Sequence, residues 1–434
     1  MSDAQLARSD ATQRDILGRS GVTPDHALGT LANSYLFERR RYVPDVLDYI
    51  ILVPTLRCNL ACSYCQVSRA SIAAKGYDWS PETLAAIKKI VAALEAPSVK
   101  LEFQGGEPTL RPDLIREVIA AVPAHVDASF VICTNLQELN SDLIELFDRD
   151  DVSISTSLDG PLKIHSEQRQ GDTFSTDRFH DNLRIVLDRY GPSKISALPT
   201  INPMSPPEPS ELIESYVSLG FHSIYLRPIN FQGFARKRHI ASKEYDSGWM
   251  NYHRRFVAEL IARNWADQSV ISEETYFSLL LRRIFRPGEN RHVDLRNPNP
   301  IGQDYIVVDH DGVVYPTDEA RMLTRSGIID LAIGDVWNGW DTPAREALNR
   351  PATLDGNPEC EACTYQAYCG RDIVDDISRY GRIDMPRHET DFCRRHLNLF
   401  DYAFELIHSD DEQVQYSLRR WLSLPGETGR LLPA

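Results

Sequence analysis

The chain has 434 residues, of which 42% are hydrophobic and 25% are charged, and its formal net charge is -15. This composition can bury a core, so it excludes wholesale disorder, and the length favours two or three domains of about 150 residues each. The acidic balance disfavours a broad electrostatic grip on nucleic acid. No apolar run approaches the roughly 18–20 residues that span a bilayer, and the polar N-terminus is unlike a signal peptide. We therefore expect a cytoplasmic protein with neither a nucleic-acid nor a membrane partner.

Residues 1–47 show only a weak apolar pattern, which predicts a short N-terminal extension. Strand-like and helix-like segments then alternate over 48–240, as is typical of an α/β protein with a parallel sheet and crossover helices. Six such units predict a partial (β/α)6 barrel of the TIM type, open on one side, with its site at the carboxyl ends of the strands. The predicted strands are 49–56, 99–103, 129–133, 152–158, 195–201 and 223–229.

The second half of the chain predicts smaller units. Residues 241–300 have the pattern of amphipathic helices that bridge two domains, and 301–400 form a small cysteine-rich domain. That domain begins with an apolar hairpin pattern around an Asp311-Gly312 turn. Residues 401–434 predict a C-terminal helix followed by a polar tail.

Seven of the eight cysteines fall into two groups that suggest metal sites. Because cytosolic thiols stay reduced, clustered cysteines there indicate metal binding or catalysis and not disulfides. The first group, C-x3-C-x2-C, holds Cys58, Cys62 and Cys65. Three thiolates can hold three irons of a [4Fe–4S] cube and leave the fourth iron open to a substrate. The alternative is structural zinc, which needs four ligands and finds no His in this loop.

The second group supplies four cysteines, as a closed site requires. They are Cys360, Cys363, Cys369 and Cys393. Spacing alone fits zinc and a fully ligated [4Fe–4S] cluster equally well. The remaining Cys133 lies in an apolar strand pattern, where a small core residue is the simpler interpretation.

The motifs of residues 50–235 resemble those of radical S-adenosylmethionine (SAM) enzymes. The loop RCNLACSYC resembles the family's cluster loop, in which Tyr64 is the aromatic residue. QGGEP (104–108) resembles its glycine-rich SAM motif, TNL (134–136) its third-strand motif, and SLDGPLKIHSEQR (157–169) its fourth-strand motif. All these segments follow predicted strands, so they would meet at one end of the barrel.

The resemblance implies SAM as cofactor and a [4Fe–4S] cluster whose free iron holds the SAM amino and carboxylate groups. Glycines let a backbone approach a ligand closely, and arginine suits carboxylate recognition. A tight turn, a capping serine and a solvated arginine are the simpler alternatives for the individual residues. The implied cofactor-binding residues are Tyr64, Gly105, Gly106, Glu107, Asn135, Ser157 and Arg169. Arg227 ends the sixth strand and faces either the site or solvent, and His165 is assigned no chemistry.

The C-terminal cysteines resemble a SPASM or twitch domain, the auxiliary-cluster module of peptide-modifying radical SAM enzymes. Thr317 and Ile373 stand where two of that pattern's seven cysteines are expected, and a third is absent before Gly312. The four that remain match the outer cluster, which implies one auxiliary [4Fe–4S] cluster. Asp318 keeps the position of a proton acceptor found in some members, so it is our candidate catalytic base. A structural ion pair with Arg321 is the alternative.

The segments LVPTLRCNLACSYCQVSRA (52–70) and YPTDEARML (315–323) resemble the His-Xaa-Ser system maturases. Those maturases are similar to enzymes that install cyclophane cross-links in ribosomal peptides. This predicts an oxidoreductase that abstracts a hydrogen from a ribosomally made precursor peptide and forms an intramolecular side-chain cross-link. It further implies an external electron donor such as flavodoxin or ferredoxin. A thioether-forming or sulfatase-type maturase is the alternative within the superfamily, and a non-catalytic zinc scaffold is the alternative outside it.

Overall fold

The computed structural model describes residues 11, 27–32, 34, 46–169, 173–244, 247–286, 295–424 and 431. Most of the predicted N-terminal extension, part of the predicted helical bridge and nearly all of the chain after 424 lie outside the described residues.

An eight-stranded sheet forms the centre of the fold, in the order β14-β13-β12-β1-β4-β5-β6-β7. The pairs from β12 through β7 are parallel, whereas β13 and β14 run antiparallel at one edge. Parallel strands need crossover connections, and helices supply them here. The strands are β1 (Tyr49–Thr55), β4 (Ser98–Gly105), β5 (Asp127–Cys133), β6 (Val152–Ser157), β7 (Ile195–Leu198), β12 (Tyr305–Val308), β13 (Val313–Tyr315) and β14 (Gly334–Asp335).

The last two predicted barrel strands are each interrupted. The fifth divides around Pro199 into β7 and β8 (Thr200–Ile201), because proline has no N–H for the ladder. The sixth divides into β9 (Ser223–Ile224) and β10 (Arg227–Pro228). β10 pairs with β8, and β9 pairs with β11 (Glu273–Glu274), both in parallel. The predicted α/β barrel architecture is therefore confirmed, with its last two strands shortened.

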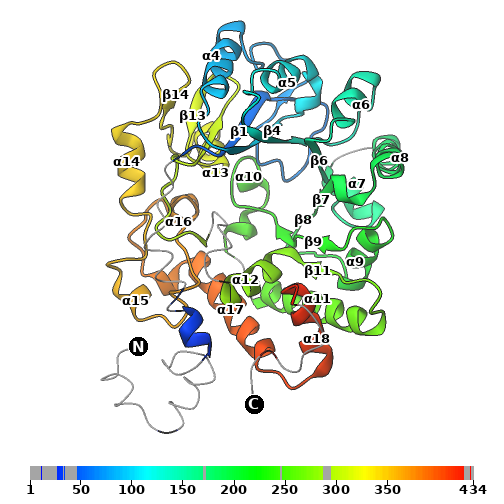
Figure 1. Ribbon diagram of the computed structural model, residues 1–434, viewed down its shortest axis with the longest axis vertical. Helices are drawn as coiled ribbons and strands as arrows, with labels where there is room; N and C mark the ends of the chain where they lie inside the picture. Colours follow the sequence, from blue (N-terminus) through cyan, green and yellow to red (C-terminus); the bar gives the residue numbers. More distant parts are fainter. Residues whose placement is uncertain are drawn as a thin grey trace.

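Helices flank the barrel strands and bury an apolar core against them (Figure 1). Ser80 caps the first, since its side chain accepts a hydrogen bond from the amide of Thr83. Every second residue of these strands, for example Phe103 and Ile132, points toward the helices and is buried in this core. The helices are α4 (Pro81–Ala92), α5 (Pro112–Ile119), α6 (Ser141–Phe147), α7 (Leu162–Arg169), α8 (Thr173–Tyr190) and α9 (Pro209–Val217).

A second set of helices follows the barrel segments. Of these, α11, α12, α15, α17 and α18 lie at the end of the molecule away from α4 and α5, whereas α13 lies beside β13 (Figure 1). The sequence predicted a polar tail beyond the C-terminal helix, but residues 412–421 form a further helix, α18. Its Val414, Leu418 and Trp421 are buried, so the amphipathic pattern there was missed. The set comprises α10 (Ala235–Arg238), α11 (Ser247–Ala266), α12 (Thr275–Phe285), α13 (Asp318–Arg325), α14 (Pro343–Asn349), α15 (Pro358–Glu361), α16 (Ile373–Tyr380), α17 (Asp391–Ile407) and α18 (Glu412–Trp421). Within the described ranges, none of the helices combines the length and apolarity needed to cross a bilayer.

Candidate functional site

A cavity of about 260 Å³ opens at the carboxyl ends of the barrel strands, and we call it the cofactor cavity. It brings together every predicted cluster ligand of the first cysteine group and every predicted SAM contact. These come from segments up to about a hundred residues apart in sequence, which the parallel strands deliver to one edge. The predicted residues that line it are Cys58, Cys62, Tyr64, Cys65, Gly105, Gly106, Glu107, Asn135, Ser157 and Arg169.

The first cysteine loop begins at β2 (Arg57–Cys58), which pairs with β3 (Ala70–Ser71). Burial raises the pKa of the Cys58 thiol to about 12, and it also raises the pKa of Cys62. The backbone oxygen of Cys65 accepts a hydrogen bond from the amide of Phe234 at 3.0 Å, which ties the loop to the chain after β10. Buried thiols of raised pKa give up their protons when a metal binds, so these residues fit an iron cluster.

Gly105 and Gly106 owe their identity to the backbone that precedes the cysteines. A Cβ on either glycine would lie 2.3 Å from a carbonyl oxygen of residues 55–57. The amides of Gly106 and Glu107 donate to the carbonyl oxygens of Thr55 and Arg57. The glycines thus let the two loops of the cofactor cavity pack directly on each other, in addition to facing it.

The Glu107 carboxylate is buried and joins two of the predicted motifs. Its Oε1 accepts from the Thr109 hydroxyl at 2.6 Å, and its Oε2 accepts from the Asn135 amide at 2.8 Å. The Asn135 side chain in turn donates to Asn59 Oδ1 at 2.8 Å and lies 3.8 Å from Cys58 Sγ. Burial raises the pKa of Glu107, against the effect of these donors. Glu107 therefore organises the wall of the cavity beside the cysteines.

Asp159 is a residue of the site that the sequence interpretation missed. Its side chain is fully buried, and its Oδ2 accepts from Tyr64 Oη at 2.8 Å and from Arg169 Nε at 3.1 Å. Its Oδ1 accepts from the amide of Thr200 at 3.0 Å. The Arg169 guanidinium also lies 5.5 Å from the centre of the Tyr64 ring. One carboxylate thus orients two cavity-lining side chains. Asp159 belongs to the SLDG segment of the fourth-strand motif, so its place in that motif could have identified it as a site residue.

His165 supports Asp159 and is buried away from the cavity. Its Nδ1 lies 3.3 Å from the amide of Asp159, and its ring stacks on Phe179 at 4.4 Å. Burial lowers its pKa to about 3, so the ring is neutral and accepts this hydrogen bond. This position agrees with the absence of any chemical assignment to His165.

The floor of the cofactor cavity contains a buried carboxylate, Glu102. It accepts from Gln104 Nε2 at 2.6 Å, from Tyr49 Oη at 2.8 Å and from Cys133 Sγ at 3.4 Å. Lys100 Nζ lies 2.7 Å from Glu102 Oε2, the oxygen that also accepts from Tyr49. The expectation of a core position for Cys133 is therefore wrong, since this thiol lines the cavity. Strand alternation explains it, because Glu102 and Cys133 point inward where their neighbours point to the helices.

A second cavity, of about 360 Å³, adjoins the cofactor cavity, and Leu198 and Arg227 line both. Its wall mixes aromatic side chains from α11, α12 and α17, namely Trp249, Tyr276 and Phe392, with charged ones. We call it the substrate cavity. Its position beside the cofactor cavity and its combination of aromatic and charged groups suit an amphipathic organic ligand.

The four cysteines of the second group line a third cavity, of about 130 Å³. It lies between the loop of α15 and the start of α17, and Cys393 belongs to the first turn of α17. Burial raises the pKa of Cys369 to about 12 and that of Cys393 to about 11, with further increases from the other thiols of the group. The convergence of four thiols on one small cavity fits a closed metal site.

Asp318, the predicted base, begins α13 and lines neither the cofactor cavity nor the substrate cavity. Its Oδ1 accepts from Arg321 Nε at 2.8 Å, and the Arg321 side chain is fully buried. The structure therefore contains the alternative ion pair with Arg321. The next residue, Glu319, lines the substrate cavity.

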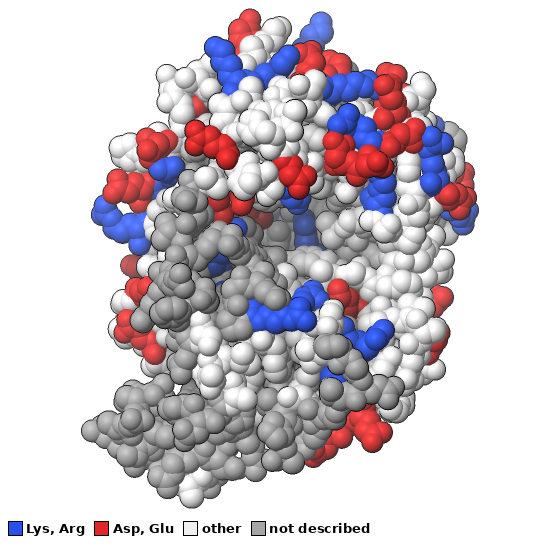
Figure 2. Space-filling model, viewed as in Figure 1, with Lys and Arg blue, Asp and Glu red and all other residues white. Residues whose placement is uncertain are grey.

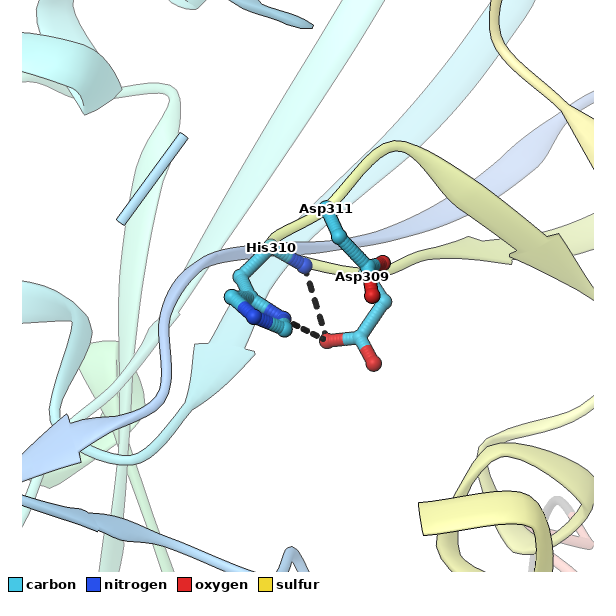
Figure 3. A group of neighbouring side chains, drawn as sticks. All are labelled: Asp309, His310 and Asp311. Atoms are coloured by element: carbon cyan, nitrogen blue, oxygen red, sulfur yellow. Dashed lines mark hydrogen bonds and ion pairs between the residues drawn. The ribbon is translucent and has the colours of Figure 1, made fainter. Parts of the chain in front are cut away.

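Asp309, His310 and Asp311 at the β12–β13 turn place ligand-type atoms within 4.8 Å of one another (Figure 3). Arg325 Nε lies 3.3 Å from Asp309 Oδ2, and Arg321 Nη1 lies 3.8 Å from Asp309 Oδ1. Burial alone would raise the pKa of Asp309, but His310 and these guanidinium groups bring it to about 2. Cationic partners already neutralise this group, so it anchors the turn on α13 instead of offering a cation site.

Residues 52–215 match the family model of the Radical SAM superfamily. Among curated proteins, the cysteine-type anaerobic sulfatase-maturating enzyme of Clostridium novyi is 26% identical over 286 residues, 63% of this chain and 73% of that one. The GTP 3′,8-cyclase of Mycobacterium ulcerans is 27% identical over 334 residues, 69% of this chain and 84% of that one.

Solved structures share the fold over most of the chain. Native anSMEcpe with bound AdoMet and Cp18Cys peptide superposes with a TM-score of 0.63 at 16% identity, covering 82% of this chain and 97% of that one. SuiB of Streptococcus suis bound to the precursor peptide SuiA gives a TM-score of 0.51 at 13% identity, covering 80% and 77%. The family match shows a radical SAM domain over residues 52–215, and the solved structures show that their α/β fold extends over most of the chain.

Proposed function

We propose that the chain is a radical SAM peptide maturase that forms an intramolecular cross-link of the cyclophane type in a ribosomally made precursor peptide. The observation that carries the proposal is the shared wall of Leu198 and Arg227, which joins the cofactor cavity to the substrate cavity. A side chain in the second cavity would lie beside a cofactor in the first. The relation to SuiB, a protein solved with its precursor peptide, supports a peptide substrate.

Cys58, Cys62 and Cys65 would hold a [4Fe–4S] cluster, and SAM would occupy the rest of the cofactor cavity. When bound, this pair supplies a 5′-deoxyadenosyl radical that takes a hydrogen atom from the substrate. Arg169 would donate to the SAM carboxylate, and Asp159 holds its guanidinium in place. Ser157 at the end of β6 and Tyr64 in the cysteine loop complete the binding wall.

The second cysteine group would hold an auxiliary [4Fe–4S] cluster that accepts an electron from the substrate. Restoring aromaticity to a substrate ring after bond formation also releases a proton, which needs a base within about 3 Å. Asp318 stays our sequence-based candidate for this role. Glu319 is the second candidate, because its side chain lines the substrate cavity and that of Asp318 does not.

The domain boundaries at 48, 241, 301 and 401 and the flavodoxin or ferredoxin donor belong to the same proposal. The relation to a sulfatase-maturating enzyme favours a second candidate, a sulfatase-type maturase. Two co-expressions separate the two: one with small open reading frames beside the gene, and one with a sulfatase.

Mass spectrometry of a co-expressed small peptide should show the loss of two hydrogens per cross-link, with fragmentation blocked inside the ring. The matched control replaces Cys58, Cys62 and Cys65 by Ala, which should abolish 5′-deoxyadenosine production and leave the other cluster in place. Anaerobically purified protein should contain about eight irons per chain, four for each cube. Zinc without sulfide would refute the enzyme proposal, and a modified sulfatase with an unmodified small peptide would favour the second candidate.

A further inference from the structure

Arg227 occupies the junction between the cofactor cavity and the substrate cavity. It begins β10, the second part of the divided sixth strand, and its side chain is half-buried. Its one side-chain hydrogen bond within the described ranges runs from Nη2 to Gln66 Oε1, at 3.4 Å. Its Nε is buried without a partner, and so is Gln66 Nε2.

The wall that carries Arg227 and Gln66 is tightly built. A Cβ on Gly233 would lie 1.7 Å from the carbonyl oxygen of Gln66, so the chain after β10 packs directly on the cysteine loop. The amide of Phe234 donates to Cys65 O in the same contact. A fixed backbone on both sides means that these two side chains are held at the junction by the fold.

The acidic residues of the substrate cavity do not neutralise Arg227. Across the described ranges, no carboxylate oxygen lies within ion-pair distance of its guanidinium, since its one polar contact there is with Gln66. Three carboxylates of this cavity have other partners. Glu274 accepts from the amides of Leu226 and Phe277, Asp375 pairs with Arg379, and Asp372 accepts from the amides of Val374 and Asp375.

An arginine that keeps buried nitrogen without a partner is costly to the folded protein, because an unsatisfied buried donor is destabilising. It is also the side chain whose planar fork best matches a carboxylate. Figure 2 shows Lys and Arg side chains along the central hollow of one face, against the overall acidity of the chain. In the substrate cavity itself, Arg227 and Arg395 line the wall together with four carboxylates.

We propose that Arg227, steadied by Gln66, binds a carboxylate of the substrate, either an Asp or Glu side chain or a C-terminal carboxylate. The proposal deepens the proposed function, on which it rests only for the statement that the carboxylate belongs to a peptide. It assigns the substrate an acidic group close to the reacting side chain. The SAM carboxylate is the competing ligand, and the test includes it.

The test uses the reconstituted protein with iron, sulfide and SAM, and three small probes followed by ligand-observed NMR titration. N-acetyl-aspartate α-amide carries a side-chain carboxylate, N-acetyl-alanine a terminal one, and N-acetyl-asparagine α-amide neither. One of the two acids should bind at least about tenfold more tightly than the neutral amide, the range of a charge-assisted hydrogen bond. The acid that binds identifies the source of the carboxylate.

Arg227→Gln should remove this preference and leave the weak affinity for the neutral amide unchanged, and Arg227→Lys should keep part of it. The matched control is Arg184→Gln, a change at an exposed position on α8 whose pair with Asp181 spans 3.9 Å. It should bind all three probes as the parent does. Iron content and melting temperature report whether each variant folds.

Three results would overturn the proposal. They are equal binding of acids and amide by the parent chain, a carboxylate preference that survives in Arg227→Gln, and a SAM dissociation constant that rises in Arg227→Gln by the factor expected for the probes. The last would assign Arg227 to the cofactor. Because these titrations need no turnover, a failure to detect cross-linked peptide would count against the proposed function and leave the carboxylate result intact.

Discussion

Asp159→Asn tests whether one buried carboxylate organises the cofactor cavity. The substitution keeps the shape of the side chain and removes its charge. Its partner Arg169, at the end of α7, has only 10% of its side chain exposed and would be left without a counter-charge. Removing one partner of a buried ion pair typically costs about 3–5 kcal/mol, because the other charge is left uncompensated. The asparagine can still accept from Tyr64 or from the Thr200 amide, so we expect the lower end, about 3 kcal/mol. The loosened Arg169 should also weaken SAM binding, by about tenfold for the loss of one oriented hydrogen bond to a charged group.

The assay is anaerobic urea unfolding followed by tryptophan fluorescence, with SAM binding measured by equilibrium dialysis. Asp148→Asn is the matched control, because Asp148 also pairs with an arginine, Arg189, but both side chains are close to half exposed. Exposed pairs contribute about 0–1 kcal/mol. If Asp159→Asn lost no more stability than Asp148→Asn and bound SAM as the parent does, the assigned role of Asp159 would be refuted.

Three further predictions concern the proton acceptor, the pH dependence of stability and the glycine loop. Glu319→Gln should lower the yield of cross-linked peptide per 5′-deoxyadenosine more than Asp318→Asn does, if the residue that lines the substrate cavity is the base; the reverse order would return the role to Asp318. His165 is neutral in the folded chain with a pKa of about 3, below its ordinary value near 6.5, so its contribution to stability is complete above about pH 6.5 and is lost as the pH falls toward 3. Between pH 7.5 and 5.5 the parent should therefore lose about 1 kcal/mol more unfolding free energy than His165→Gln. Urea unfolding that gives the same change for parent and variant between the two pH values would contradict this. Gly106→Ala forces a Cβ to 2.3 Å from backbone oxygens and should cost both stability and SAM affinity, whereas Gly76→Ala meets open space and should cost only about 1–2 kcal/mol of backbone strain.

Local patterns predicted the barrel elements well because each pattern has a local cause. The sequence from Ser80 onward has a capping serine, a proline at the first helical turn and apolar residues at helical spacing, and α4 begins there, at Pro81. The hairpin turn at Asp311-Gly312 follows from the left-handed conformation that Gly312 adopts, with φ at 82°. The cavity-lining positions could be predicted as well, since parallel strands bring the residues that follow them to one edge.

The parts that escaped prediction depend on contacts between distant residues. The partners of Asp159 come from the cysteine loop, from α7 and from the first residue of β8, and no spacing in the sequence connects them. The inward position of Cys133 depends on the phase of β5 relative to Glu102 on β4. Arg227 was left between solvent and site, because whether a strand end is covered depends on the helices that pack around it.

The hairpin of β12 and β13 fixes the position of α13 relative to the barrel sheet. β12 pairs in parallel with β1, from Tyr49 opposite Tyr305 to Leu52 opposite Val308, so it extends the barrel sheet at its open edge. The buried Asp309 follows that strand directly and binds Arg325 and Arg321 of α13. The first turn of α13 is thereby fixed relative to β1, the strand that leads into the cysteine loop. The Asp318 carboxylate accepts from Arg321 of the same helix, whereas the next residue, Glu319, lines the substrate cavity. If Glu319 is the proton acceptor, as we propose, the edge of the barrel sheet positions it through Asp309 and α13.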